Sequence, residues 1–357
     1  MTRLNVKAST HAYDIVIDEG IRFNVKKYLK KTYSSILVVT DEHVAAHYLD
    51  DVLDSLKDSR TYSAIVPPGE KSKSIQAYYE LQSKAIECGL DRESLIIALG
   101  GGVIGDLAGF VAATFMRGVD YIQVPTTILA HDSSVGGKVA INHETGKNLI
   151  GNFYAPQAVI YDIETLKSLS DQEVRSGYAE LIKEALIDDE AFLRDLLSVS
   201  LKNKTADQLS NDLHKGIQVK AKIVESDERE SGIRKFLNLG HTLAHAIEAD
   251  LSYDGKITHG EAVAIGLLFA LEMSEDYYSV NLPLDDVREW FKDNDYPLEL
   301  DSFDVDRMIE LMKRDKKAVQ DNIQMVLLKE IGKPEAVQVE DEYVRKIAKS
   351  FVRKLVK

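Results

Sequence analysis

The chain has 357 residues, which is enough for two domains of ordinary size with large cores. Its 44 basic and 58 acidic residues give a formal net charge of -14, which opposes binding to nucleic acid or to anionic membranes. A single cysteine, Cys88, excludes an internal disulfide framework. The sequence shows neither a secretory leader nor an apolar run of membrane length, so we expect a cytoplasmic protein with no membrane partner.

In chain order, short β-branched runs first alternate with helical patterns. These runs lie at residues 13–17, 35–40, 63–66, 94–99, 121–124 and 158–161. Such alternation is typical of an α/β domain with a largely parallel sheet. Beyond residue 170 the pattern is helical, except for a strand-like stretch at 322–329 that favours a small hairpin. We predict an α/β fold in which residues 1–168 form a Rossmann-like domain with a largely parallel sheet and residues 169–357 form a mainly α-helical domain.

A glycine-rich turn follows the strand predicted at 94–99 and precedes an apolar helix. Gly100, Gly102 and Gly105 match the G-x-G-x-x-G spacing, which lets the backbone approach a pyrophosphate at a helix N-terminus. The spacing alone is weak, because tight strand-to-helix turns also collect glycines for packing. Ligands of α/β sheets bind at the carboxyl ends of strands, where further polar residues occur. The residues that could contact a dinucleotide together are Asp41, Glu70, Lys73, Gly101, Gly102 and Asp106, although each charged side chain alone is more often a solvated loop residue.

The segment 124–138 is polar, rich in glycine and packed with small hydroxyl side chains, and it ends at Lys138. Lys147 and Asn148 follow shortly, again beside glycines. Ammonium groups and an amide next to flexible backbone are suited to bind a phosphate. The alternative is that these lysines only make a loop more soluble.

Three of the nine histidines, His241, His245 and His259, lie close together in the sequence. Helical geometry places His241 and His245 on one face, and His259 on the next helix can complete a site for a first-row metal. Glu180, on an upstream helix, supplies a carboxylate. A carboxylate with two imidazoles favours an open zinc site that acts as a Lewis acid. By itself, the histidine pair is more often a solvated or core-facing helix surface.

Taken in order, these segments resemble the 3-dehydroquinate synthase family of the sugar phosphate cyclase superfamily over nearly the whole chain. The matching segments are 67–73 (PPGEKSK), 100–106 (GGGVIGD), 116–119 (MRGV), 124–127 (VPTT), 132–138 (DSSVGGK), 146–151 (GKNLIG), 179–183 (AELIK), 237–242 (LNLGHT), 259–263 (HGEAV) and 315–317 (DKK). The resemblance implies NAD and zinc (Zn2+) as cofactors, with Co2+ as a substitute metal, and a homodimer as the working unit.

By position, the resemblance implies a role for each matching residue. Zinc would be held by Glu180, His241 and His259, which replaces the pairing of His241 with His245 that helical geometry alone favours. The phosphate side would include Lys138, Asn148, Lys183, His245, one of Lys316 and Lys317, and Arg117 from the neighbouring subunit. The substrate carboxylate would contact Lys220, Arg234 and Asn238, with Asp132 next to the zinc site. NAD would contact Asp41, Glu70, Lys73, Gly101, Gly102, Asp106, Thr126, Thr127, Lys138 and Lys147.

The implied reaction converts 3-deoxy-D-arabino-heptulosonate 7-phosphate into 3-dehydroquinate and phosphate, a step of the shikimate pathway that leads to the aromatic amino acids. It would proceed by transient oxidation with NAD, elimination of phosphate, re-reduction, ring opening and intramolecular aldol closure. Two positions depart from the family pattern. His131 precedes Asp132 where a longer segment is common, and Ala244 stands where glycine is frequent.

Three other interpretations stay open. A related sugar phosphate cyclase would share the zinc, NAD and phosphate groups, and only the carboxylate-binding set distinguishes it. A metal-dependent polyol dehydrogenase would not need so many cationic side chains and would release NADH on turnover. A non-catalytic metal- or nucleotide-binding regulator would release no phosphate. Arg234 has its own alternative, because the charged run 228–230 just before it is typical of a solvated surface.

Overall fold

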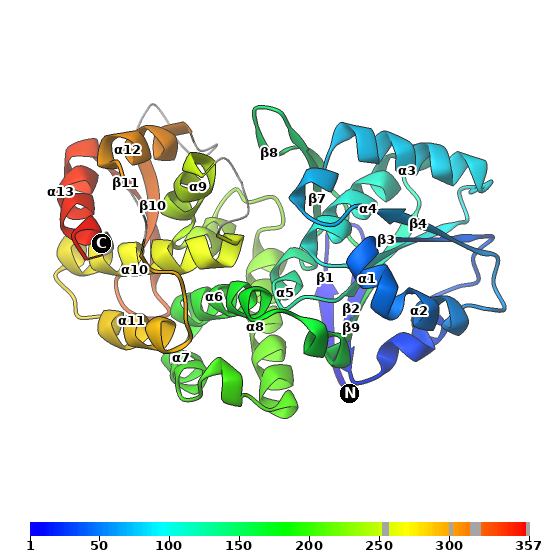
Figure 1. The fold of residues 1–357 in the computed structure, drawn as a ribbon, viewed down its shortest axis with the longest axis horizontal. Helices are drawn as coiled ribbons and strands as arrows, with labels where there is room; N and C mark the ends of the chain where they lie inside the picture. The colour runs from blue at the N-terminus through cyan, green and yellow to red at the C-terminus, as the bar shows by residue number, and fades with distance from the viewer. Residues whose placement is uncertain (252–256, 300–302, 315–322, 355–357) are drawn as a thin grey trace. The chain divides into compact units, whose positions relative to one another are not determined.

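The computed structural model describes residues 1–251, 257–299, 303–314 and 323–354, so Lys316 and Lys317 lie outside the described residues. The chain forms two compact units (Figure 1). Unit 1 comprises Met1–Leu169 and Lys220–Arg229, and unit 2 comprises Ser170–Val219 and Glu230–Lys357. Among the described residues, no helix combines the length and the apolar character that a membrane crossing requires.

A seven-stranded sheet forms the centre of unit 1. Its strands are β1 (Thr2–Lys7), β2 (Ala12–Asp18), β3 (Ile36–Asp41), β4 (Thr61–Val66), β5 (Leu95–Gly100), β6 (Asp120–Pro125) and β9 (Ala158–Asp162). The spatial order is β1-β2-β9-β6-β5-β3-β4, and every neighbouring pair is parallel except β1 with β2. The six strands predicted from the β-branched runs are therefore confirmed, and β1 was not predicted.

Helices cover both faces of this sheet. The helical segments of unit 1 are η1 (Ile21–Tyr28), α1 (Glu42–Val44), η2 (Ala45–Leu49), α2 (Asp50–Ser55), η3 (Glu70–Ser72), α3 (Ile75–Glu87), α4 (Gly102–Thr114), η4 (Phe115–Arg117), α5 (Ala130–Ser133) and η5 (Ile163–Ser168). Leu37 and Ile96 pack in one core cluster with residues of α3 and α4. Val38 and Ile97, one position on, pack in a second cluster with residues of η1 and α2. Alternate strand residues thus face opposite cores, which explains why the strands are continuous apolar runs.

Lys138, Lys147 and Asn148, which the sequence suggests for phosphate binding, lie in a hairpin. It consists of β7 (Lys138–His143) and β8 (Gly146–Phe153), which pair antiparallel. A Cβ at Gly109 of α4 would lie 2.4 Å from a Val139 methyl carbon, and one at Gly151 would lie 2.4 Å from the Val139 carbonyl oxygen. Only glycine lets α4 and the two strands approach this closely. Gly146 and Gly151 of β8 also interrupt the alternation that marks a strand, so the hairpin was not predicted.

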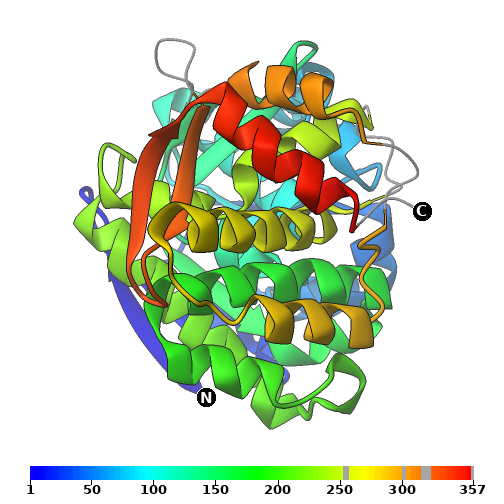
Figure 2. The same cartoon turned by 90° about the vertical axis from the view of Figure 1, so that its left-hand side faces the viewer.

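Unit 2 is mainly helical. Its elements are α6 (Asp171–Asp188), α7 (Glu190–Leu197), η6 (Leu201–Asn203), α8 (Ala206–Ser226, whose end belongs to unit 1), η7 (Ile233–Asn238), α9 (His241–Asp250), α10 (His259–Tyr278), α11 (Leu284–Asp293), α12 (Val305–Arg314), β10 (Ile323–Leu328), β11 (Pro334–Val339) and α13 (Asp341–Val352). The predicted hairpin is confirmed by β10 and β11. Figure 2 shows α10 beside both α6 and α11, and α10 also contacts α9, α13 and β10. This largely buried helix therefore organises the unit.

Candidate active site

Glu180 lies on the buried part of α6. This helix begins after its N-cap Ser170 and is buried from residue 176 to residue 187. Glu180 and Lys183 are each 1% exposed, and the Lys183 Nζ lies 2.5 Å from the Glu180 Oε2. Burial alone would raise the pKa of Glu180, but Lys183 and His241 hold that pKa well below its usual value. The carboxylate is therefore ionised.

His241 and His259 are each the first residue of a helix, α9 and α10 respectively. The His241 Nδ1 lies 3.2 Å from the Leu239 carbonyl oxygen, and the His259 Nδ1 lies 3.0 Å from the Glu248 Oε2. The other nitrogen of each ring faces Glu180. Its Oε1 lies 3.4 Å from the His241 Nε2 and 3.3 Å from the His259 Nε2. Two imidazoles and one carboxylate oxygen thus converge.

The geometry of Glu180, His241 and His259 fits a divalent metal. Their ligand atoms lie within 4.8 Å of one another. In a tetrahedral zinc site with bonds of about 2.0–2.1 Å, the ligand atoms are about 3.3 Å apart. The two separations from the Glu180 Oε1, 3.4 Å and 3.3 Å, match this value. Three protein ligands would leave one coordination position open for a substrate or a water molecule.

His245 lies one turn beyond His241 on α9. Its ring stacks against His259 with centroids 6.0 Å apart and meets His241 edge-on with centroids 5.5 Å apart. His245, Glu248 and His259 form a second group whose ligand atoms lie within 4.8 Å of one another. The Glu180 carboxylate, however, faces His241 and His259. His245, which helical spacing pairs with His241, therefore lies beside the three residues that the family resemblance implies as ligands, Glu180, His241 and His259.

The two histidines that face Glu180 differ in basicity. Burial lowers the pKa of His241 to about 4 and outweighs the effect of the Glu180 carboxylate. Burial also opposes the charging of His259, but the carboxylates of Glu248 and Glu180 together raise its pKa to about 10. Metal ligation requires a neutral imidazole, so a metal bound here would displace a proton from His259.

Glycines let the three helices that carry these residues approach one another closely. A Cβ at Gly260 would lie 1.9 Å from the Ser176 carbonyl oxygen on α6, and a Cβ at Gly266 would lie 2.0 Å from the Gly240 carbonyl oxygen. Gly260 N also donates to the Ser176 hydroxyl at 3.1 Å. The first contact holds the start of α10, with His259, against the helix of Glu180. The second holds α10 against the start of α9.

In unit 1, α4 begins directly after β5, as the glycine motif predicts. Gly101 is its N-cap, and a Cβ there would lie 3.0 Å from the Thr127 Cγ2. A Cβ at Gly105 would lie 2.8 Å from the Gln123 Oε1 on β6. These glycines therefore allow close packing, which is the alternative to dinucleotide binding that the sequence left open. The partly exposed start of α4 still offers backbone N–H groups to an anion.

The buried Lys73 is the centre of a polar cluster. Its Nζ donates to the Asp106 Oδ2 at 2.7 Å and to the Asn148 Oδ1. Burial would lower the pKa of Lys73, but the carboxylates of Asp106 and Glu70 raise that pKa, so the ammonium group stays charged. Asn142 Nδ2 donates to the Glu70 Oε1 at 2.8 Å. The structure thus brings together four of the predicted residues, Glu70, Lys73, Asp106 and Asn148.

Other predicted residues of unit 1 lie in smaller groups. The Lys220 Nζ lies 2.7 Å from the Asp132 Oδ2. Asp41 ends β3 and caps α1 through its side chain. Thr126 and Thr127 follow β6, and Thr126 N donates to the Gly100 carbonyl oxygen at 3.1 Å. Lys138, Lys147 and Asn148 all come from the β7–β8 hairpin.

Arg234 and Asn238 both lie on η7 in unit 2. Arg234 is 1% exposed, so the solvated-surface alternative for it is wrong. Asn238 Nδ2 donates to the Glu230 Oε1 at 2.9 Å. Arg117, on η4 of unit 1, is exposed and has a left-handed φ of 71°, next to Met116 with a φ of 47°.

The sequence analysis missed Glu248 and Asn142, which bind predicted residues directly. Glu248 lies two helical turns after His241, so its spacing on the metal-bearing helix was an available signal. Asn142 had no comparable signal, because its contacts depend on how two strands pair.

Two family models match consecutive parts of the chain. The model for the N-terminal part of 3-dehydroquinate synthase matches residues 63–176, and the model for the C-terminal part matches residues 177–318. The curated 3-dehydroquinate synthase of Oceanobacillus iheyensis is 52% identical over 359 aligned residues, which cover 100% of each chain.

Solved structures share the fold and confirm the predicted fold class. A 2-deoxy-scyllo-inosose synthase in complex with carbaglucose-6-phosphate, NAD+ and Co2+ has a TM-score of 0.88 at 26% identity, and the match covers 98% of this chain and 100% of the other. A 2-epi-5-epi-valiolone synthase of Streptomyces hygroscopicus subsp. jinggangensis, with NAD+ and Zn2+ bound, has a TM-score of 0.83 at 20% identity and 98% coverage of both chains. With the two family models and a relative that matches over the full length, the chain belongs to the 3-dehydroquinate synthase family.

Proposed function

We propose that the chain catalyses the conversion of 3-deoxy-D-arabino-heptulosonate 7-phosphate into 3-dehydroquinate and phosphate, with NAD and one divalent metal. The observation that carries the proposal is the convergence of Glu180, His241 and His259 with a buried lysine against the carboxylate. The relative from Oceanobacillus iheyensis supports the same activity. The structure of 2-deoxy-scyllo-inosose synthase with NAD+ and Co2+ supports NAD and a divalent metal as the cofactors.

When bound, NAD would accept and return a hydride while the metal acts as a Lewis acid on the alcohol that is oxidised. The chain's own residues prepare this site. Lys183 keeps Glu180 ionised through Oε2, and Oε1 faces the two imidazoles. Glu248 orients the ring of His259 through its Nδ1. Each proposed ligand side chain therefore has a second contact that holds it in place: Glu180 with Lys183, His241 with the Leu239 carbonyl oxygen, and His259 with Glu248.

The two charged ends of the substrate are assigned to different side chains. Lys138 and Asn148 offer a point charge and an amide donor to the phosphate, whose negative charge grows as it leaves. Arg234 offers a planar fork that suits a carboxylate. Because Arg234 is buried, a charge-assisted hydrogen bond there would be stronger than one at the surface.

Release of phosphate tests the proposal. The protein, supplied with zinc, substrate and a catalytic amount of NAD, should release phosphate while the near-ultraviolet absorbance of NADH stays flat, because the hydride is returned. Growth of free NADH in proportion to phosphate would favour a dehydrogenase, and no phosphate release would favour a regulator. Glu180→Gln should abolish the activity. Glu190→Gln, which changes an exposed carboxylate on α7, is the matched control and should retain it.

Choice of substrate separates this function from that of a related cyclase. Sedoheptulose 7-phosphate lacks the carboxylate that Arg234 and Lys220 are proposed to bind. Charge-assisted hydrogen bonds contribute about 1.5–3 kcal/mol each, so losing two should lower kcat/KM by roughly two to four powers of ten. Comparable turnover of both sugars would contradict the synthase assignment.

We propose zinc as the metal and Co2+ as a substitute, because the donor set and its separations suit a tetrahedral site.

We also propose a homodimer in which Arg117 serves the phosphate pocket of the partner, supported by its exposed, left-handed backbone. Mixed dimers of Arg117→Ala and Lys183→Ala proteins should regain activity. No recovery after verified mixing would assign Arg117 to its own chain. The cytoplasmic location stays a prediction.

A further inference from the structure

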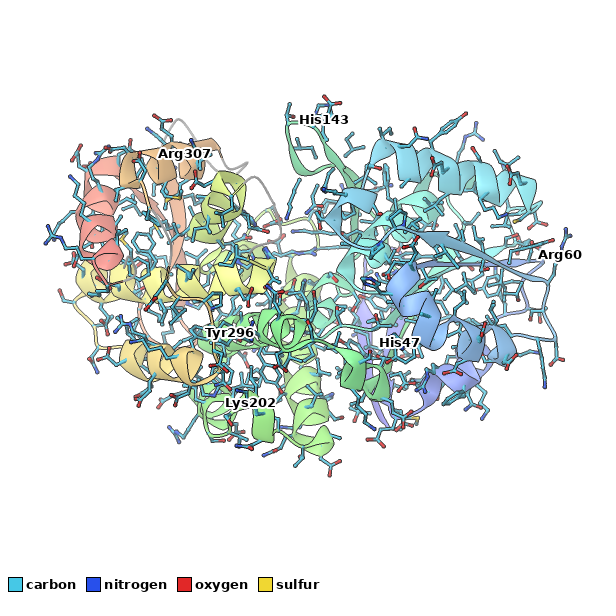
Figure 3. The ribbon with its side chains drawn as sticks, in the orientation of Figure 1. His47, Arg60, His143, Lys202, Tyr296 and Arg307 are labelled. Carbon is cyan, nitrogen blue, oxygen red and sulfur yellow. The ribbon has the colours of Figure 1, made fainter. Side chains whose placement is uncertain are left out.

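The β7–β8 hairpin pairs irregularly at one point. The regular register that begins at Lys138 ends at Ile141, and the next pair toward the hairpin tip begins at His143, which Figure 3 labels. Asn142 lies between them and spans the same length as three residues of β8, 147–149. Bulges of this kind redirect side chains and are common next to active sites. The irregularity therefore leaves the polar groups of Asn142 outside the ladder.

Asn142 uses these groups for three hydrogen bonds. Its backbone N–H donates to the Lys73 carbonyl oxygen at 2.7 Å. Its Nδ2 donates to the Glu70 Oε1 at 2.8 Å, and its Oδ1 accepts from the Asn148 N–H at 2.9 Å. Asn148 has a φ of 55°, a left-handed conformation that is uncommon for residues other than glycine but that asparagine adopts more readily than most. One side chain thus joins the turn after β4 to the bulge of β8 and holds the bulge in an uncommon conformation.

The two joined segments carry different parts of the proposed site. Glu70 and Lys73 belong to the residues expected to contact NAD, whereas Asn148 belongs to those proposed to bind phosphate. We infer that Asn142 is a positioning residue that couples NAD binding at the turn to the ordering of the phosphate-binding bulge. This inference rests on the proposed function.

A direct contact between Lys73 and Asn148 also links the two segments. That contact holds the side-chain amide of Asn148, whereas Asn142 holds the Asn148 backbone. The backbone sets where Lys147 and Asn148 point, so the Lys73 contact alone should not keep the bulge in place. Removing the Asn142 side chain deletes two hydrogen bonds of ordinary net strength, which corresponds to a loss of about 5- to 100-fold in the population of the ordered bulge.

Hydrogen exchange of the full chain, followed by mass spectrometry, tests the coupling without relying on turnover. In the unmodified protein, saturating NAD should slow exchange both at residues 67–73 and at residues 143–153. In Asn142→Ala, NAD should still slow exchange at 67–73 but no longer at 143–153, and kcat should fall about 5- to 100-fold. Asn152→Ala is the matched control. It removes an exposed amide of the same hairpin, and the Asn152 Oδ1 accepts only a local hydrogen bond from the Phe153 N–H. This variant should behave like the unmodified protein.

A second variant keeps the test valid if Asn142→Ala unfolds the hairpin. Asn142→Asp keeps the size of the side chain and the oxygen that accepts from Asn148, but it loses the donor to Glu70. Without NAD, exchange at 143–153 should then be as slow as in the unmodified protein. Addition of NAD should no longer slow it further.

Two outcomes separate the inference from the proposed function. If NAD slows exchange at 67–73 but not at 143–153 in the unmodified protein, or if both Asn142 variants keep the hairpin response, the coupling is refuted and the function stands. No slowing at either segment, together with no phosphate release, would overturn the function and the inference with it.

Discussion

Replacing Gly260 by alanine should abolish metal binding at the proposed ligands Glu180, His241 and His259. The new Cβ would lie 1.9 Å from the Ser176 carbonyl oxygen, whereas real Cβ atoms essentially never come within 3.0 Å of such a neighbour. Because the obstacle is backbone, no side-chain rotation relieves it. The start of α10 must therefore retreat from α6 by about 3.0 − 1.9 = 1.1 Å.

A retreat of this size carries His259, the preceding residue, away from Glu180. Metal–ligand distances tolerate changes of only about 0.2 Å, so His259 would cease to act as a ligand. Losing only the hydrogen-bond partner of a ligand costs about 10- to 100-fold in metal affinity, so losing the ligand should cost more than about 100-fold. The crowding itself should lower the free energy of unfolding by about 1–3 kcal/mol.

Elemental analysis after dialysis and competition with a chromogenic chelator measure this effect. Gly89→Ala is the matched control, because Gly89 has a φ of 67° and its nearest neighbour to a new Cβ lies 3.7 Å away. The control should lose about 1–2 kcal/mol of stability from backbone strain but keep the metal. A Gly260→Ala protein that binds metal with unchanged affinity would refute the role of the α6–α10 contact in placing His259.

Three further substitutions test individual side chains. Glu248→Ala should lower metal affinity about 10- to 100-fold, because the His259 Nδ1 loses its carboxylate partner; an unchanged affinity in chelator competition would contradict this role. His241→Ala should lose the metal, whereas His245→Ala should keep it and lose rate; elemental analysis showing the reverse would mean that the ligands are misassigned. Arg234→Ala should erase most of the preference for the heptulosonate phosphate over sedoheptulose 7-phosphate, measured as a ratio of kcat/KM values; an unchanged ratio would exclude Arg234 from carboxylate binding.

Periodicity was sufficient to predict most of the sheet. The segments that became β3 and β5 are continuous apolar runs because helices cover both faces of the strands, and such runs are visible without any tertiary information. The β7–β8 hairpin escaped prediction for the opposite reason. Gly151 of the hairpin and Gly109 of α4 both approach Val139 closely, and this approach exists only in the folded chain.

The candidate site divides in the same way. Local patterns proposed the histidines, the glycine turn and the basic residues as site candidates. The order of the motifs indicated the family, which the family models and the full-length relative confirm. Helical spacing alone favoured His241 with His245, because it relates only residues three or four positions apart. The packing of α6, α9 and α10 instead brings the Glu180 Oε1 to His241 and His259.

Burial and partner choice required the tertiary structure. The charged run before Arg234 favoured a surface position and the apolar stretch after it favoured an inward one, and the packing over η7 decides for burial. The bond of Glu248 to His259 and the three bonds of Asn142 join residues from different helices, strands or turns. Local sequence encodes periodicity and residue chemistry, but which donor meets which acceptor across the chain is decided only when the glycine contacts set the distances between elements.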